Sequence, residues 1–337
     1  MIQIIAEIAQ GYEGNYQQAA MLIRAGKFAG ADAVKMQLVY ADELCTSDYK
    51  DFKLFSQLEM CDEHWQKLSN IAKDIDIEFH LDIFGEKSLL LCERINANAV
   101  KIHSTDMGNI GLLELVEKSS IKKVFLSSGG AYLNEIIKAV DVLKSKEIIL
   151  LLGFQGYPTQ VNENQISRVY LLRKYFIDNS SISIGFADHA NPQTIQSLLI
   201  PSMAIGAGAR FIEKHLTLSS VLKLEDYESA LNPDQFLVFT KELKCCYEAF
   251  GSAVENQDFG MTDSEVNYRN WTRKHVVASR KITSDSIIYP EDLRLKRTPN
   301  KNAISDINNI CGKKAIRDIE PDEPILATMI EMKDANE

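Results

Sequence analysis

The sequence predicts a (β/α)₈ barrel followed by a small β-rich module. Eight short apolar runs alternate with helix-length amphipathic stretches over the first 250 residues, and this alternation ends after residue 250. Alternating strands and helices are typical of a parallel sheet, and eight repeats are the number that closes a barrel. An open doubly wound sheet usually has fewer strands and a glycine-rich first turn, whereas the first turn here is AQGYEG. We therefore expect a barrel over 1–250, a linker over 251–272 and a separate β module over 273–337.

Each of the eight runs has the character of a buried strand. They begin with IIAEIA and end with RFIEKHL, and they are nearly continuous in aliphatic residues. Such runs are expected where helices cover both faces of a parallel sheet. In chain order the predicted strands are 4–9, 33–39, 77–84, 99–104, 123–128, 147–154, 183–188 and 210–216.

The segments between the runs have helical periodicity. The stretch 15–30 closes on Gly30, a residue that commonly ends helices. In 62–75, Trp65 and Leu68 fall on one face, as in an amphipathic helix. A last helical pattern at 232–250 precedes the polar, glycine-containing segment that we expect to be the linker.

Composition narrows the class of protein. Of the 337 residues, 45% are hydrophobic and 25% charged, which is typical of a globular protein with a sizeable core. The net charge is −10 without a dense Lys/Arg block, so we expect neither nucleic acid nor membrane as a partner. The six cysteines include no C-x-x-C pair, and MIQIIAEIAQ does not resemble a secretory signal. We expect reduced thiols and a cytoplasmic location.

Two histidines end the last two predicted strands. His189 follows SIGFAD and His215 ends RFIEKH, and functional groups of such barrels lie at the C-terminal ends of the strands. Two neutral imidazoles facing one cavity suit a divalent ion such as Mn²⁺, Fe²⁺, Co²⁺ or Zn²⁺. The alternative is a hydrogen-bonded structural pair. For His64, His103 and His275 we expect local or surface roles.

Two lysines lie inside apolar runs, Lys35 in AVKMQ and Lys101 in AVKIHS. A buried ammonium is costly unless an anion meets it. We interpret the pair as a clamp for a phosphate or carboxylate, with Ser104 and Ser127 or Ser128 donating hydrogen bonds.

Carboxylates near the same strand ends leave other interpretations open. The lysines could form an internal salt bridge, to Glu7 or Glu213, or include a Schiff-base lysine. Glu7 and Asp106 are candidates for acid–base work, because positioned carboxylates move protons on hydroxyls and water. Their alternative role is to pair with the same lysines.

Several motifs together resemble those of the sialic acid synthase family. They are IIAEIAQGYEGN, GADAVKMQ, VKIHSTDMGNIGLLELV, FLSSGGA, IGFADHANP, GARFIEKHLTL and EDYESALNPDQF. Members of that family condense phosphoenolpyruvate with an N-acylated hexosamine-type sugar to give a nonulosonic acid, as phosphoenolpyruvate-dependent transferases that form a C–C bond and release phosphate. The resemblance runs from residue 3 to about residue 330, because the C-terminal module is similar to the family's antifreeze-like (SAF) domain.

The resemblance implies a role for each matching residue. His189 and His215 would bind Mn²⁺, or another divalent ion such as Mg²⁺ or Co²⁺, which polarises the sugar aldehyde. Glu7 would move a proton on the sugar, and Asp106 would lie near the water that adds to the pyruvyl carbon. Phosphoenolpyruvate would be held by Lys35, Lys101, Ser104 and Ser127 or Ser128. The sugar would meet Gln37, Tyr157, Asp226, Trp271 and Arg297. The last of these would reach the site of a partner subunit, which implies a domain-swapped homodimer.

Four departures from the family pattern bear on the substrate. The end of the sixth strand reads GFQGYP, so Gln155 or Gly156 replaces a polar contact, and Ala187 replaces a serine. Asp82 stands where a threonine is usual, and GYEG replaces NHNG in the first loop. We expect a working synthase with an altered acceptor sugar. The alternatives are a metal-dependent 3-deoxy-ulosonate synthase of the heptulosonate or octulosonate type and a non-catalytic sugar-binding relative.

Overall fold

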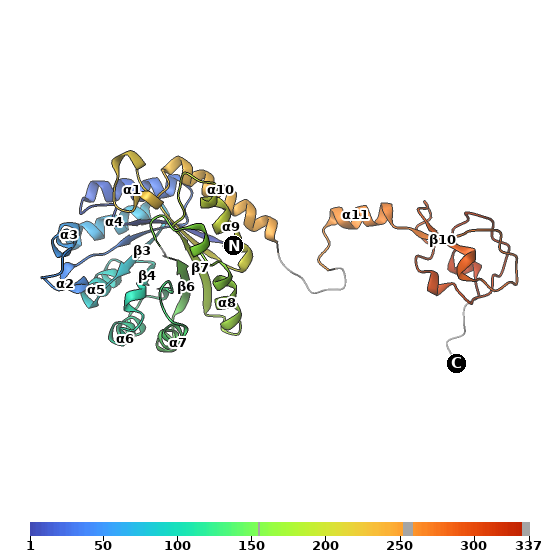
Figure 1. Ribbon diagram of the computed structural model, residues 1–337, viewed down its shortest axis with the longest axis horizontal. Helices are drawn as coiled ribbons and strands as arrows, with labels where there is room; N and C mark the ends of the chain where they lie inside the picture. The colour runs from blue at the N-terminus through green and yellow to red at the C-terminus, as the bar shows by residue number, and fades with distance from the viewer. Residues whose placement is uncertain (154–155, 252–258, 332–337) are drawn as a thin grey trace. The chain divides into compact units, whose positions relative to one another are not determined.

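The computed structural model describes residues 1–153, 156–251 and 259–331 (Figure 1). The chain divides into two compact units, Met1–Gly251 and Ser252–Glu337. Each unit has its own hydrophobic core, and the two are described separately below.

The first unit is a closed barrel of eight parallel strands that pair in chain order, so the predicted fold is confirmed. Helices surround the strands on the outside (Figure 1). The strands are β1 (Gln3–Ala9), β2 (Ala33–Gln37), β3 (Glu78–Ile83), β4 (Ala99–Ile102), β5 (Lys123–Ser127), β6 (Glu147–Gly153), β7 (Ile182–Asp188) and β8 (Phe211–His215). Each predicted run contains most of one of these strands.

The helices follow the predicted alternation, with local additions. The α-helices are α1 (Tyr16–Phe28), α2 (Ala41–Leu44), α3 (Phe52–Leu58), α4 (Asp62–Asp74), α5 (Glu86–Arg94), α6 (Ile110–Lys118), α7 (Leu133–Val142), α8 (Ser167–Tyr175), α9 (Gln196–Ala207) and α10 (Pro233–Phe250). The side chain of Asn15 caps α1 by accepting a hydrogen bond from the amide of Gln18. Gly30 follows α1 with φ +76°, a conformation that residues with a side chain rarely adopt. The short helices α2 and α3 lengthen the connection between β2 and α4.

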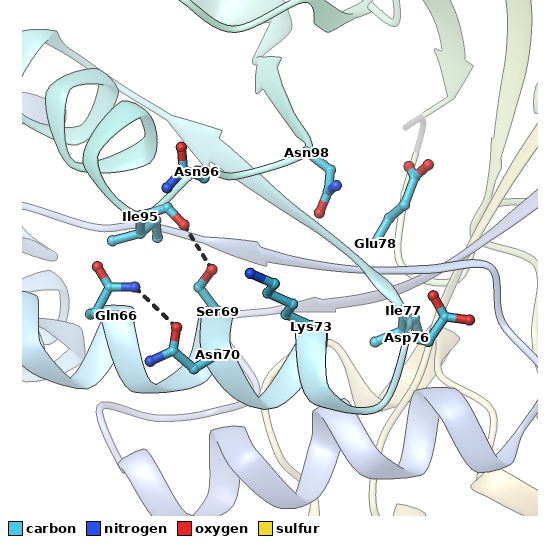
Figure 2. A pocket seen from close by; sticks show the side chains of 10 residues that line it. All are labelled: Gln66, Ser69, Asn70, Lys73, Asp76, Ile77, Glu78, Ile95, Asn96 and Asn98. Atoms are coloured by element: carbon cyan, nitrogen blue, oxygen red, sulfur yellow. Dashed lines mark hydrogen bonds between the residues drawn. The ribbon is translucent and has the colours of Figure 1, made fainter.

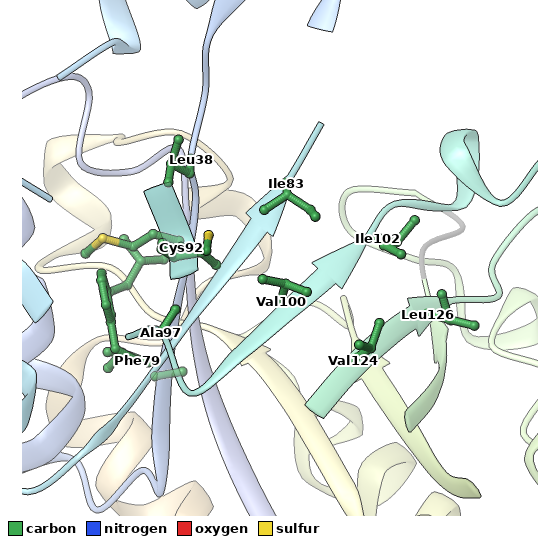
Figure 3. Close-up of a cluster of buried hydrophobic side chains, with 14 of the residues drawn as sticks. Leu38, Phe79, Ile83, Cys92, Ala97, Val100, Ile102, Val124 and Leu126 are labelled. Carbon is green, nitrogen blue, oxygen red and sulfur yellow. The ribbon is translucent and has the colours of Figure 1, made fainter. Parts of the chain in front are cut away.

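Apolar side chains fill the space between the strands and the helices. Phe79, Val100 and Val124 point outward from β3, β4 and β5, where Cys92 of α5 joins them (Figure 3). A smaller apolar group that includes Phe125 fills the barrel interior. Burial of such side chains contributes about 1.5–3 kcal/mol each, so these layers supply much of the driving force for folding.

Alternation along β3 controls which residues face the barrel interior. Successive side chains of a strand point to opposite faces, so Glu78, His80 and Asp82 share the face opposite that of Phe79. His80 lies against the ring of Phe125 at a centroid distance of 5.2 Å. Glu78 lies at the start of β3 and accepts hydrogen bonds from Lys123 at 3.0 and 3.3 Å. Asp82 lies near the C-terminal end of the strand, where the sequence predicts the site.

The second unit is small and rich in extended segments. It contains α11 (Asp263–Thr272) and an antiparallel pair of strands, β9 (His275–Ala278) and β10 (Leu293–Lys296). Helix α11 lies within the segment that we expected to be a linker, and its first turn is stabilised by a capping box between Thr262 and Glu265. In the described part of the chain, we find no helix both long and apolar enough to cross a membrane.

Candidate active site at the C-terminal ends of the strands

A small polar cavity opens at the C-terminal ends of the barrel strands. The space within it that water can occupy is about 30 Å³. Side chains from most strands reach it, as expected for a site of this fold. It is lined by Glu7, Ala9, Gln37, Lys101, His103, Ser127, Leu151, Gly153, Tyr157, Ala187, His189, Glu213 and His215.

Five buried charged side chains, which we call the ionic cluster, lie at the cavity floor: Glu7, Lys35, Asp82, Lys101 and Glu213. The Lys35 ammonium contacts Glu7, and it lies 3.0 Å from Asp82 and 3.2 Å from Glu213. The Lys101 ammonium lies 3.0 Å from Asp82, 3.5 Å from Glu213 and 3.6 Å from Glu7. The structure therefore shows the internal salt bridge, the alternative to the clamp, and Lys35 is not among the residues that line the cavity.

Crowding of three carboxylates around two ammonium groups controls their protonation. Burial, followed by the neighbouring carboxylates, raises the pKa of Glu7 to about 8 despite the nearby lysines. Burial acts in the same direction on Glu213, but Lys101 and Lys35 outweigh it and lower the pKa of that carboxyl. Burial opposes the charge of Lys101, but the surrounding carboxylates raise its pKa well above the usual range. Burial therefore favours the protonated form of Glu7. The surrounding carboxylates favour the charged ammonium form of Lys101, which argues against a neutral Schiff-base amine.

The two predicted histidines lie next to each other. The ring centroids of His189, directly after β7, and His215, at the end of β8, are 5.1 Å apart. The ring of Tyr157 packs edge-on against both, at 4.9 and 5.8 Å. Burial lowers the pKa of His189 to about 3, and burial together with His189 lowers the pKa of His215 well below its usual value. Both imidazoles are therefore neutral near pH 7, the form that binds metals.

These donors fit a divalent ion with open coordination positions. Two neutral imidazoles share one cavity, and the Asp226 carboxylate lies 3.8 Å from Nδ1 of His215. Burial, with Glu225 and Glu228, raises the pKa of Asp226 to about 6. Among the described residues, we find no group of three His, Cys, Asp or Glu side chains arranged to hold a metal. A metal here would have His189 and His215 as its protein ligands and the remaining positions free for substrate or water.

The other predicted phosphoenolpyruvate and acid–base residues divide into two groups. Ser127 lines the cavity, whereas the hydroxyl of Ser128 donates to the backbone carbonyl of Leu151 at 3.2 Å. Ser104 and Asp106 form a short 3₁₀ turn after β4 and are partly exposed. Neither is among the residues that line the cavity, and Asp106 accepts a hydrogen bond from Asn109.

The residues predicted for the sugar fall in both units. Gln37 lines the cavity and accepts a hydrogen bond from Gln10 at 2.7 Å, and Tyr157 also lines it. Trp271, near the end of α11, is 80% exposed, and Arg297, directly after β10, is also exposed. Their contact with a partner's site stays a prediction. Gln155 lies outside the described residues.

Three further residues belong to the site. Asp82 and Glu213 complete the ionic cluster, and the sequence signal for both is a charged residue inside an apolar run, LDIF and RFIEKH. His103, for which we expected only a local role, lines the cavity. Burial, followed by Lys101, lowers the pKa of His103. It follows β4 directly, so its place after a strand was the available signal.

A larger pocket, of about 410 Å³, lies at the opposite end of the strands. It is formed by α4 and the segments that lead into β3 and β4 (Figure 2). The Ser69 hydroxyl donates to the carbonyl of Ile95 there at 2.8 Å, and Gln66 donates to Asn70. Because catalytic groups of this fold come from the other end of the strands, we assign this pocket no part in the site.

The first unit is a (β/α)₈ barrel that carries buried lysines and two histidines at the C-terminal ends of its strands. A small β-rich unit follows it in the chain. Residues 22–255 match the NeuB family, and residues 273–331 match the SAF domain. The chain therefore belongs to the NeuB family, and its resemblance to the sialic acid synthases is confirmed.

Named relatives extend over nearly the whole chain. The N,N′-diacetyllegionaminic acid synthase of Legionella pneumophila is 26% identical over 97% of this chain and 94% of that protein. The pseudaminic acid synthase of Campylobacter jejuni is 27% identical over 94% of this chain and 93% of that protein. The crystal structure of an N-acetylneuraminic acid synthetase from Leptospira borgpetersenii, in complex with citrate, is 27% identical with a TM-score of 0.71. It covers 80% of this chain and 91% of that one. These relatives are synthases of nonulosonic acids.

Proposed function

We propose that this protein is a nonulosonic acid synthase, which condenses phosphoenolpyruvate with an N-acylated hexosamine-type sugar and releases phosphate. One observation carries the proposal: the paired imidazoles of His189 and His215 and the ammonium of Lys101 line the same cavity of a NeuB-family barrel. The relatives named above are synthases of legionaminic, pseudaminic and sialic acids, which supports this reaction class.

Charged and hydroxyl groups would hold phosphoenolpyruvate. Lys101 is the ammonium that lines the cavity, and Ser127 places a hydroxyl beside it. A charge-assisted hydrogen bond to a carboxylate or phosphate is about twice as strong as a neutral one. Lys35, beneath them, keeps the ionic cluster compact through its contacts with Asp82 and Glu213.

His189 and His215 would hold Mn²⁺, which when bound supplies a Lewis acid for the aldehyde oxygen of the sugar. Glu7 is placed to handle the proton in this step. Its Oε1 accepts a hydrogen bond from the amide of Ala9 at 2.7 Å, and its pKa of about 8 lets it carry a proton at neutral pH. Glu7 would donate that proton to the oxygen that becomes a hydroxyl when C3 of phosphoenolpyruvate attacks.

Tyr157 packs edge-on against both histidines and lines the same cavity. It would therefore contact the sugar beside the metal ligands. Phosphate would leave after water adds to C2. By resemblance alone, Asp106 would lie near that water and Ser104 would help to hold phosphoenolpyruvate.

The test is a reaction of purified protein with Mn²⁺, phosphoenolpyruvate and a panel of sugars that includes N-acetylmannosamine and 6-deoxy-diacetamido hexoses. We expect phosphate release only with an N-acylated hexose, and a product of the summed mass less phosphate by mass spectrometry. Release with a pentose or tetrose phosphate instead would favour a 3-deoxy-ulosonate synthase. Failure with every sugar would contradict the proposal.

The metal assignment has its own test, which needs no turnover. His189→Ala and His215→Ala should each lose Mn²⁺ binding in calorimetry while the far-UV circular dichroism stays native. His64→Ala is the matched control, because His64 stacks on Tyr16 and does not line the cavity. Unchanged Mn²⁺ affinity in both site variants would exclude these ligands.

A further inference from the structure

Asp82 bridges the two lysines of the ionic cluster. Its Oδ1 lies 3.0 Å from Nζ of Lys35, and its Oδ2 lies 3.0 Å from Nζ of Lys101. The Asp82 side chain is fully buried, and Lys101 is nearly so. The Asp82 carboxylate thus binds both ammonium groups, at the distances expected for a bound carboxylate or phosphate ligand.

The balance of charges in the ionic cluster indicates that neither ammonium group is free to bind an anion. Three carboxyl groups, those of Glu7, Asp82 and Glu213, surround the two ammonium groups, so the cluster has no excess of cations. An anion that enters a buried site meets repulsion from each fixed carboxylate, and low local polarity strengthens that repulsion. Removing the charge of Asp82 would take the nearest carboxylate away from Lys101, whose ammonium lines the cavity and could then bind an anion.

We propose that Asp82 is a specificity-determining residue that acts as an internal competitor for anionic ligands at Lys101. A ligand's carboxylate or phosphate has to displace Asp82 from this ammonium, so the wild-type protein binds small anions weakly. The identity of the natural anion as phosphoenolpyruvate rests on the proposed function, but the competition itself does not.

The test compares Asp82→Asn with the wild-type full-length chain, because asparagine keeps the shape and removes the charge. Affinity for inorganic phosphate and for phosphoenolpyruvate is measured by calorimetry, with and without Mn²⁺ and with no sugar present. We expect the Kd for both anions to fall at least about tenfold in the variant. In turnover, the KM for phosphoenolpyruvate should fall while the KM for the sugar stays within about twofold.

Glu78→Gln is the matched control. Glu78 lies on the same strand and the same face, and its carboxylate also binds a lysine, Lys123, at 3.0 Å. It lies at the other end of the barrel, so its loss should leave both anion affinities unchanged. A second control, Lys101→Met in the Asp82→Asn background, should abolish the gain.

Equal or weaker anion binding by a folded Asp82→Asn variant would overturn the proposal. Asp82→Thr and Asp82→Ser provide smaller neutral replacements, and unfolding of all three variants would also overturn it, since Asp82 would then serve stability alone. The proposed function can fail separately. A gain in anion affinity with no product from any sugar would support the competitor role and contradict the synthase.

Discussion

Replacing Lys35 with methionine tests whether the ionic cluster is a fixed part of the fold. The side chain is fully buried, and its ammonium contacts Glu7, Asp82 and Glu213. Methionine has a similar length and no charge, so it fills the space and removes only the cation. Three carboxylates would then surround the single ammonium of Lys101.

The structure allows the size of the effect to be worked out. Removing one partner of a buried ion pair costs about 3–5 kcal/mol, because the remaining charge is left buried without compensation. In a unit the size of Met1–Gly251, 1 kcal/mol corresponds to about 2–4 °C in Tm, so we expect Tm to fall by roughly 10 °C. Without Lys35, the carboxylates bind protons more tightly in the native state than in the unfolded one. The loss should therefore be larger at pH 8 than at pH 5.5.

The assay is thermal and urea unfolding followed by circular dichroism at both pH values. Lys123→Met is the control, since Lys123 pairs with Glu78 at the other end of the barrel, where the side chains are partly exposed. We expect it to lose clearly less stability. A loss below about 1 kcal/mol for Lys35→Met, or one that is the same at both pH values, would refute the reasoning.

Three other predictions concern Glu7, Gly185 and Arg297. The pKa of Glu7 is raised to about 8 in the native state, so the wild-type protein should lose stability as the pH rises from about 5 to 8. Urea unfolding curves over this range should show a smaller loss of stability for Glu7→Gln than for the wild type. A Cβ at Gly185 would lie 2.9 Å from Leu151 and 3.0 Å from Phe211, so Gly185→Ala should cost about 1–3 kcal/mol in the same assay, and an unchanged midpoint would contradict this packing. Arg297→Ala should raise the KM for the sugar much more than the KM for phosphoenolpyruvate, and equal changes would place Arg297 elsewhere.

The barrel could be predicted from the sequence because local patterns carry the information. Buried parallel strands need continuous apolar runs, and the surrounding helices need one apolar face, so both periods are visible in the chain. The same reasoning placed His189 and His215 together, since consecutive strands of a barrel are neighbours. Helix α11 was not anticipated, because its composition is polar and its start depends on a capping box around Thr262.

Contacts inside the barrel were decided by the tertiary structure. Lys35 and Lys101 were recognisable as buried cations, but whether a ligand or the protein's own carboxylates would meet them depends on distances between separate strands. In the folded barrel Asp82 lies 3.0 Å from both lysines and Glu213 lies 3.5 Å from Lys101, while His103 lines the cavity.

The sequence by itself thus determined the order of strands and helices and the residue types at the strand ends. The tertiary structure alone decided how their charges are matched. The physical reason is that hydrophobic periodicity is a property of neighbours in the chain, whereas Coulomb energy and burial depend on groups brought together through space.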